Sequence, residues 1–280
     1  EIIDINGKII YKYKQEAKTF LSIFTKGRLC LFLHNKKGDN YMKKKRISMA
    51  ILSLGLAVGL LAGCSTESKE DKYIIATDAK YAPFSMEVSG EYEGIDVEIL
   101  SAVAEEAEFE YELKPMDFSA IIPGLTSNQL DGAIAGMSIT EERKKTLDFS
   151  DGYFESGLSI VVKGDNNEIN SIEDIVGKSV AVKNGTGGEA WALENADKYN
   201  LKISHYEDSP TMFLAVQNSN NDFALEDYPV IAYKIQVDGD NALKIAGDKI
   251  TSVNYGFAVN KGKNKELLDK FQEGLATIKE

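Results

Sequence analysis

Two hydrophobic patterns alternate along residues 73–280. Short apolar runs such as Tyr73–Thr77 are typical of buried strands, whereas Val97–Ala107 has an apolar residue every three or four positions, as on one face of a helix. The same patterns predict helices over Phe118–Leu125 and Thr140–Leu147, and strands over 109–113, 133–135, 158–162, 179–183, 202–206, 223–225, 243–246 and 255–259. Strands and helices that alternate over about 200 residues predict an α/β architecture.

Capping residues mark the beginning of two predicted helices. Thr140 is expected at the N-cap of the helix Thr140–Leu147, with Glu141 and Glu142 in the first turn. Ser209 and Pro210 are expected at the N-cap and first helical positions of another helix.

Residues 42–63 have the layout of a secretory signal peptide. A basic cluster, Lys43–Arg46, precedes an uncharged apolar stretch, Ile47–Leu61, which is short for a membrane span of about 20 residues. The segment ends in Leu-Ala-Gly-Cys and resembles the bacterial lipobox, which implies that Cys64 is lipidated and becomes the mature N-terminus. Two acyl chains on this cysteine would anchor the protein stably. The alternative is an uncleaved anchor in which Cys64 has no special role.

The position of this signal peptide predicts the roles of the residues on either side of it. Secretory signals begin at the N-terminus, so we expect Met42 to be the initiator and residues 1–41 to be a mis-called upstream extension. Residues 64–71, the lipidated cysteine and the polar residues after it, are expected to form a flexible tether.

Charge is distributed unevenly along the chain. Residues 1–63 hold 12 of the 32 basic and 4 of the 44 acidic side chains, which leaves 20 basic and 40 acidic side chains in residues 64–280. The net negative charge of residues 64–280 repels nucleic acid and anionic lipid headgroups, so both are poor candidates as partners. Two cysteines provide no disulfide framework, and with only two histidines we expect neither a metal site nor haem.

A glycine-rich segment, "VAVKNGTGGEAW" (180–191), joins a predicted strand to the beginning of a helix, an arrangement that can hold an anion. It matches neither G-x-G-x-x-G, because position 190 is alanine, nor the P-loop, because no Gly-Lys-Ser/Thr follows. A plain connection between strand and helix is the alternative interpretation.

A second candidate segment is "AGMSITEERKK" (135–145). Gly136 allows a ligand to approach the backbone, and Ser138 offers a hydroxyl and an N–H group. Arg143 is expected in the first turn of a helix, where its charge opposes the helix dipole, so an anionic partner is expected for it. Its planar guanidinium matches a carboxylate through two parallel hydrogen bonds.

Acidic residues end two predicted strands: Asp78 ends one, and Glu226 and Asp227 end another. In α/β sheets such positions lie at the crevice where ligands bind. Arg143 for a carboxylate, Asp227 for an ammonium, and Asp78 with Lys183 for a polar side chain together match an α-amino acid. No pair of nucleophile and base is evident, so we do not expect an enzyme.

The chain resembles the extracytoplasmic solute-binding proteins of polar amino-acid ABC transporters (family 3), most of all the glutamine-binding proteins. The matching segments are "ATDAKYAPF", "GIDVEILSAVA", "ELKPMDFSAIIPGL", "AGMSITEERKKTLDFSDGY", "VAVKNGTGG", "EDYPVIAY" and "YGFAVNKG". The resemblance implies the type II periplasmic-binding-protein fold, in which two lobes joined by two hinge strands close on a ligand. It places lobe 1 at 72–152 and 256–280, lobe 2 at 158–250, and the hinges near 153–157 and 251–255. Family members usually continue through one more helix, so we expect a truncated C-terminus.

The resemblance also assigns roles to residues. Arg143 would bind the ligand's α-carboxylate with the N–H groups of Ser138 and Gly187, and Asp227 would bind the α-ammonium with the Ser138 hydroxyl and the Gly136 carbonyl. Asp78 would accept a hydrogen bond from a side-chain amide whose oxygen Lys183 binds. The ligand-binding set also contains the two aromatic walls Tyr81 and Phe118, together with Ala135, Thr186 and Glu226.

These roles imply a monomeric, lipid-anchored receptor on the extracytoplasmic face of a bacterial membrane. It would capture a free L-amino acid, glutamine first, and deliver it to an ABC permease with its ATPase, without a cofactor. Glu226 stands where glutamine-binding relatives have histidine, so a cationic ligand, arginine or histidine, is the alternative. An enzyme of the cyclohexadienyl-dehydratase type on the same fold is an alternative from another class.

Overall fold

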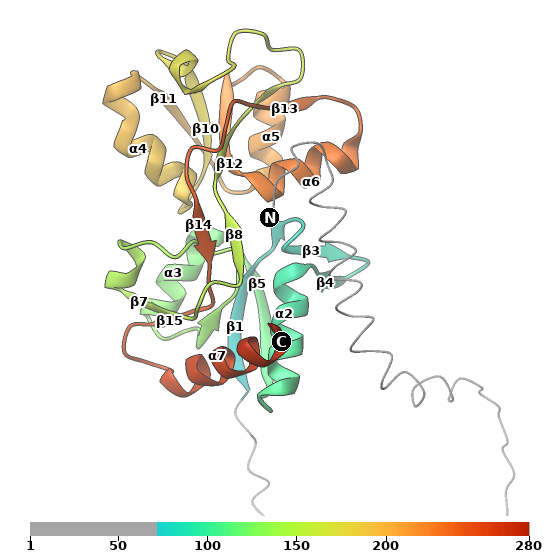
Figure 1. The fold of residues 1–280 in the computed structure, drawn as a ribbon, viewed down its shortest axis with the longest axis vertical. Helices are drawn as coiled ribbons and strands as arrows, with labels where there is room; N and C mark the ends of the chain where they lie inside the picture. The colour runs from blue at the N-terminus through green and yellow to red at the C-terminus, as the bar shows by residue number, and fades with distance from the viewer. Residues whose placement is uncertain (1–71, 280) are drawn as a thin grey trace, which may run out of the picture. The chain divides into compact units, whose positions relative to one another are not determined.

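Two five-stranded mixed sheets form the framework of residues 72–279, the part of the chain that the computed structural model describes (Figure 1). The expected upstream extension, the signal peptide, Cys64 and the tether lie outside these residues. Among the described residues, no helix combines the length and the apolar character needed to cross a bilayer.

Sheet 1 contains, in spatial order, β5 (Tyr111–Met116), β1 (Tyr73–Asp78), β6 (Gly132–Ala133), β15 (Ala258–Asn260) and β7 (Leu147–Phe149). The central strand β1 is parallel to β5 and β6, whereas β15 is antiparallel to β6 and β7. Successive residues of β1 point to opposite faces. Ile75 therefore packs with one hydrophobic cluster and Ala76 with another, and both residues are fully buried.

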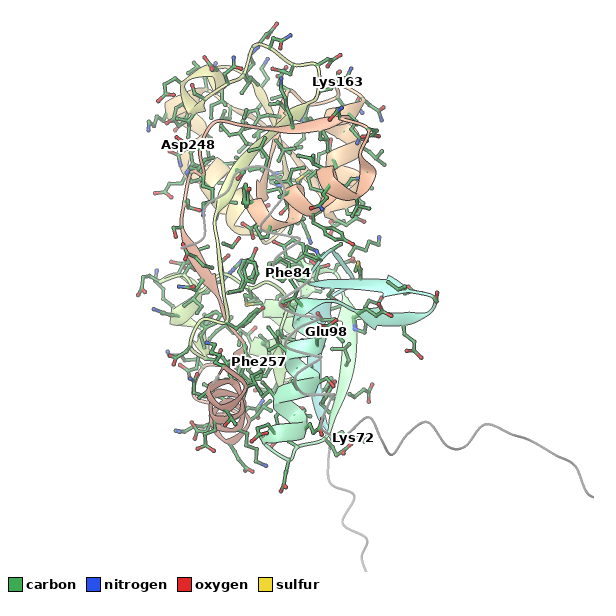
Figure 2. All side chains as sticks on the ribbon, turned by 45° about the vertical axis from the view of Figure 1, so that its right-hand side comes forward. Lys72, Phe84, Glu98, Lys163, Asp248 and Phe257 are labelled. Atoms are coloured by element: carbon green, nitrogen blue, oxygen red, sulfur yellow. The ribbon has the colours of Figure 1, made fainter. Side chains whose placement is uncertain are left out.

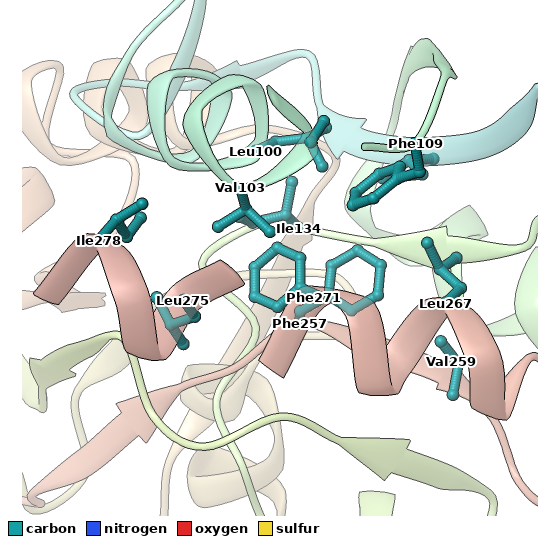
Figure 3. Close-up of a cluster of buried hydrophobic side chains, with 12 residues drawn as sticks. Leu100, Val103, Phe109, Ile134, Phe257, Val259, Leu267, Phe271, Leu275 and Ile278 are labelled. Atoms are coloured by element: carbon teal, nitrogen blue, oxygen red, sulfur yellow. The ribbon is translucent and has the colours of Figure 1, made fainter. Parts of the chain in front are cut away.

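Helices α2 (Ile95–Glu106) and α7 (Lys265–Lys279) cover one face of sheet 1, and α3 (Phe118–Thr126) covers the other. Figure 3 shows how α2 contributes Leu100 and Val103 to the first cluster, and how α7 contributes Phe271. The rings of Phe257 and Phe271 stack with centroids 4.2 Å apart. This packing ties residues from the end of the chain to the sheet that begins at Tyr73.

Sheet 2 contains, in spatial order, β11 (Lys202–Tyr206), β10 (Ser179–Lys183), β12 (Phe223–Asp227), β9 (Leu158–Lys163) and β13 (Leu243–Ala246). β10 is parallel to β11 and β12, and β9 is antiparallel to β12 and β13. Three helices pack against this sheet: α4 (Gly187–Tyr199), α5 (Ser209–Gln217) and α6 (Tyr228–Asp238). Strands β1, β10 and β12 end at Asp78, Lys183 and Asp227, which places these side chains at carboxyl ends of the sheets.

The chain passes between the two sheets twice. β8 (Phe154–Ser156) precedes β9, and β14 (Val253–Tyr255) follows β13; the two strands pair antiparallel (Figure 1). They lie in the two segments where we predict the hinges. The expected lobe boundaries and the hinge motion stay predictions.

A small three-stranded sheet of β2 (Lys80–Tyr81), β3 (Ser85–Val88) and β4 (Glu91–Glu93) was not predicted from the sequence. Its hairpin turns at Ser89 and Gly90, which both have positive φ angles. Few residues of β3 and β4 are apolar, so the hydrophobic pattern does not reveal these strands.

Three expectations about local structure are wrong. The predicted strand 255–259 is divided between two strands, β14 and β15, with Gly256 and Phe257 between them. The predicted helix Thr140–Leu147 is a short 3-10 helix, η1 (Arg143–Lys145), followed by strand β7. Thr140 does accept a hydrogen bond from the Arg143 N–H, but Leu147 is needed in sheet 1. Helix α5 begins one residue earlier than expected because Asp208, and not Ser209, is its N-cap and accepts from the Thr211 N–H at 2.8 Å. A second short helix, η2 (Ile172–Ile175), precedes β10.

Candidate ligand-binding site

The ends of β1 and β10 bring together two residues of the predicted site. Lys183 Nζ, from sheet 2, forms an ion pair with Asp78 Oδ2, from sheet 1, and both side chains are at most 3% exposed. Lys183 Nζ also lies 4.7 Å from the centroid of the Tyr81 ring and 5.6 Å from that of Phe118. A buried ammonium is costly unless it is paired, and Asp78 satisfies that requirement. The two groups expected to bind a ligand side chain thus bind each other.

Arg143 connects the two predicted binding segments. Its Nη1 donates to the Ser138 carbonyl at 2.9 Å, and its Nη2 donates to the Gly185 carbonyl at 2.9 Å, in the glycine-rich segment. Its guanidinium carbon lies 5.4 Å from the centroid of the Phe118 ring. Burial lowers the pKa of Arg143, and the nearby Asp227 carboxylate opposes this shift. A guanidinium has five N–H donors, so donors remain for a carboxylate after these two contacts.

Two tyrosines hold Asp227. Tyr81 donates its hydroxyl hydrogen to Asp227 Oδ2 at 2.7 Å, and Tyr255 donates to the same oxygen at 2.5 Å. The two phenol oxygens are also within hydrogen-bond distance of each other, at 3.0 Å. Ser156 donates to the Tyr255 hydroxyl at 2.9 Å. Burial raises the pKa of Asp227, while the hydrogen bonds from Tyr255 and Tyr81 oppose the shift.

Tyr255 and Ser156 are not among the residues predicted for the site. They lie on β14 and β8, the two strands through which the chain passes between the sheets. Tyr255 is fully buried in an apolar run of the sequence, where an aromatic residue is expected to serve the core. No sequence signal separates it from an ordinary core residue.

Aromatic packing around Phe84, which Figure 2 labels, supports the same network. Phe84 is fully buried, and its ring centroid lies 5.6 Å from that of Tyr81, 5.1 Å from that of Tyr255 and 4.9 Å from that of Phe154. Both tyrosine rings are therefore fixed by contacts that leave their hydroxyl groups directed at Asp227.

Glu226 is a buried carboxylate, 5% exposed, with one satisfied oxygen. Oε1 accepts from the Asp227 N–H at 2.9 Å, whereas Oε2 has no hydrogen bond of regular geometry. The Ser209 hydroxyl lies near enough to lower the pKa, as does Lys183, but burial and the adjacent Asp227 charge raise the pKa of Glu226 to about 7. The site thus contains a buried carboxyl group with one oxygen, Oε2, that has no regular hydrogen bond.

The remaining predicted residues lie in the two loops. Gly136 has a φ of 55°, and a Cβ there would lie 2.4 Å from Tyr81 Cε1, so only glycine fits. The Ala135 side chain packs in the hydrophobic core, which leaves its main chain for any ligand. Thr186 is the N-cap of α4, and its hydroxyl donates to the Lys183 carbonyl at 2.7 Å. Gly187 is the first residue of α4, where N–H groups lack helical partners and favour an anion.

Polar contacts at the edge of this region also join the two sheets. Lys80, in β2, forms an ion pair with Asp208, the N-cap of α5, at 2.7 Å. The Ser119 hydroxyl lies 3.4 Å from a carboxylate oxygen of Glu207. Within residues 72–279, no group of three His, Cys, Asp or Glu side chains is arranged to hold a metal ion.

The two buried carboxyl groups Glu226 and Asp96 predict how stability depends on pH. Burial raises the pKa of each to about 7, from 4.5 and 3.8 respectively. Between pH 8 and 5 the folded state therefore binds more protons than the unfolded state, and the free energy of unfolding rises as the pH falls, by about 2 kcal/mol for each group. Carboxylates with lowered pKa, such as Asp148 and Asp222, lose their stabilising effect only at lower pH.

Urea unfolding at pH 8, 7, 6 and 5 measures this effect. The double variant Asp96→Asn and Glu226→Gln serves as the control and is expected to show a much flatter profile. A maximum of stability at pH 8 in the native protein contradicts the prediction.

Comparison with known proteins is consistent with this geometry. Residues 73–280 match the family described as bacterial extracellular solute-binding proteins, family 3. The arginine-binding extracellular protein ArtP of Bacillus subtilis (strain 168) is 32% identical over 232 residues, which cover 82% of this chain and 90% of ArtP. These relatives are solute-binding proteins and not enzymes.

Solved structures give the same result for the fold. An ancestral arginine-binding protein bound to arginine is 36% identical, with a TM-score of 0.70 over 74% of this chain and 92% of that protein. The structure of such a protein bound to glutamine gives a TM-score of 0.69 at the same identity and coverage. The predicted two-lobed type II fold is confirmed.

Proposed function

Because the chain belongs to the bacterial extracellular solute-binding proteins of family 3, and so is an amino-acid-binding protein of an ABC importer, we propose that its ligand is an amino acid with a cationic side chain, arginine first. In this proposal Arg143 binds the α-carboxylate and Asp227 binds the α-ammonium, two groups that every α-amino acid has. The choice among amino acids then depends on the groups that remain.

The balance of charge among those groups supports a cationic side chain. Asp78 and Lys183 neutralise each other in a buried ion pair. Glu226 adds a second carboxyl group, buried and with Oε2 lacking a regular hydrogen bond. A guanidinium or ammonium group from the ligand would supply the missing partner, and a charged pair with several hydrogen bonds is stable when buried. The proposal rests on this buried Oε2 of Glu226, which has no regular hydrogen bond.

Glutamine, which the sequence favours, becomes the second candidate. Both ligands occur among relatives of known structure, since one ancestral arginine-binding protein is bound to arginine and one is bound to glutamine. With its pKa raised to about 7, Glu226 is partly protonated at neutral pH and then donates a hydrogen bond to an amide oxygen. A neutral ligand therefore fits the protonated site and a cationic ligand fits the ionised site.

Location and partners complete the proposal. The family is extracellular, and we place this chain at the outer face of the membrane, held by a lipid on Cys64. Its protein partner is the permease of the importer, which receives the ligand.

Calorimetric titration of the purified protein with each of the twenty amino acids tests the ligand. We expect arginine to bind with the lowest Kd, glutamine more weakly, and acidic amino acids not at all, because their side chains meet Glu226 and Asp78. Absence of saturable binding by every amino acid contradicts the proposal as a whole. Tightest binding of glutamine or of an acidic amino acid contradicts the cationic choice alone.

A further inference from the structure

Asp96 is a fully buried carboxylate that joins three segments of the chain. It lies in the first turn of α2 and is 0% exposed. Its Oδ2 accepts from the Gly136 N–H at 2.6 Å, and its Oδ1 accepts from the Tyr153 hydroxyl at 2.8 Å. Both oxygens bind partners outside α2, so the side chain does more than cap this helix.

The first of these contacts holds a loop of the proposed ligand site. Gly136 has a left-handed backbone and lies against the Tyr81 ring, which in turn binds Asp227. The direction of the Gly136 peptide depends on the acceptor of its N–H group, and that acceptor is Asp96. A short hydrogen bond to an ionised group is about twice as strong as one to a neutral group.

The second contact reaches the strands between the sheets. Tyr153 directly precedes β8, its N–H donates to the Tyr255 carbonyl at 2.9 Å, and the two rings lie 6.3 Å apart. Asp96 is therefore linked through Tyr153 to β14, whose Tyr255 binds the carboxylate of Asp227. The Asp96 carboxylate therefore supports both the loop that contains Gly136 and the paired strands β8 and β14, the second of which carries Tyr255.

The surroundings of Asp96 contain few charges. Burial raises the pKa of Asp96 to about 7, the hydrogen bonds from Tyr153 and Gly136 oppose the shift, and Asp78 on β1 raises the pKa further. The pKa of the Tyr153 hydroxyl is raised well above its usual value by burial and by Asp96, so it remains a donor. The carboxyl group therefore changes its charge near neutral pH while its two donors keep their protons.

We propose that Asp96 is a positioning residue for amino-acid binding, which fixes the Gly136 peptide in the orientation that receives a ligand and ties it to the strands between the sheets. The inference rests on the proposed function, in which Asp227 binds the α-ammonium group, and on the role of the Gly136 carbonyl beside it that the family resemblance implies. Since every amino acid has that group, Asp96 acts on all ligands alike and does not select among them.

Asp96→Asn and Tyr153→Phe test this role, with the Kd for arginine and for glutamine measured in each variant. We expect Asp96→Asn to weaken both ligands by about tenfold, and Tyr153→Phe by about threefold, with the ratio of the two affinities unchanged. Glu98→Gln is the matched control, an exposed acid of the same helix (Figure 2) that makes no contact with Gly136, and it is expected to leave both Kd values unchanged. In NMR spectra of the native protein, the Gly136 amide signal is expected to shift as the pH passes 7, and to stay constant in Asp96→Asn.

The outcomes separate the two proposals. If the native protein binds no amino acid, the proposed function is wrong. If it binds, but both variants keep their Kd within twofold of native and the Gly136 signal does not titrate, the positioning role is wrong. A change in the ratio of arginine to glutamine affinity also contradicts it. If Asp96→Asn does not fold, Tyr153→Phe and the native NMR titration still decide, because Tyr153→Phe keeps the carboxylate.

Discussion

Replacing Arg143 with alanine is expected to weaken amino-acid binding about a thousandfold. The substitution removes the guanidinium group that would bind the α-carboxylate through two hydrogen bonds at a site between the two sheets. Truncation of such a charged partner costs about 2–5 kcal/mol. It also removes the two hydrogen bonds that link the Ser138 and Gly185 carbonyls. Calorimetry with arginine and with glutamine measures the effect, which is expected to be similar for both ligands because the carboxylate is common to them.

A neighbouring residue provides the control for this variant. Lys144 is the next residue of the same short helix, is exposed, and pairs with Glu141 at 2.8 Å. Lys144→Ala also removes one positive charge, but we expect a Kd within twofold of native. Arg143→Lys keeps the positive charge but lacks the planar guanidinium, so its Kd is expected to lie between those of the native protein and Arg143→Ala. Affinity of Arg143→Ala within threefold of native refutes the proposed role.

The fold was predictable because its central strands are buried on both faces. Runs such as 158–162 and 179–183 are rich in apolar residues and match β9 and β10 closely. Strand ends were predictable for the same reason, and they locate Asp78 and Asp227. The hairpin of β3 and β4 escaped prediction because its strands lie at the surface and carry polar residues.

Arg143 shows that a candidate can rest on a wrong premise. The sequence singles it out because a positive charge in the first turn of a helix is unfavourable, yet the structure has only a short 3-10 helix there. What distinguishes Arg143 is its position against Phe118 and its contact with the Gly185 carbonyl, 42 residues away in the sequence. Spacing along the chain gives no information on such a contact.

The pairings within the site could not be predicted for a related reason. Lys183 and Asp78 are 105 residues apart, and Asp96 and Gly136 are 40 apart. Lys183 and Asp78 are expected from the sequence to face a ligand, and Asp96 is not predicted at all, because a local pattern carries no information on a distant partner. Nothing in the sequence distinguishes Tyr255 from a core residue. Only the structure shows the Asp227 carboxylate beside its hydroxyl.

Glu226→Gln is expected to reverse the preference for ligands, lowering the affinity for arginine about a hundredfold while the Kd for glutamine stays within threefold of native. The reason is the loss of a buried carboxylate whose Oε2 has no regular hydrogen bond, whereas Asp78 is already paired with Lys183. Removal of one member of a buried charged pair costs about 2–5 kcal/mol, most of it from the charge that is left unpaired. Calorimetry with both ligands at pH 7 and 8 measures the change.

The number of protons released on ligand binding is an independent measurement for the same variant. With a pKa raised to about 7, Glu226 is about half protonated at pH 7, and a guanidinium group that binds beside it favours the ionised form. Arginine binding at pH 7 is therefore expected to release up to about half a proton, as seen from the dependence of the binding enthalpy on the buffer. Glu226→Gln abolishes this release, whereas glutamine binding shows no release in either protein.

Glu207→Gln is the control for the loss of a negative charge near the site. Glu207 is exposed and lies at the edge of the same region, where it accepts from the Asn184 side chain at 2.7 Å. Long-range attraction between exposed charges is weakened by salt, so this variant is expected to leave the ratio of arginine to glutamine affinity unchanged. An equal effect of both variants would mean that only net charge matters. An unchanged ratio in Glu226→Gln, together with undiminished proton release, would show that the carboxylate does not meet the ligand, and the cationic side chain would then need Asp78 released from Lys183.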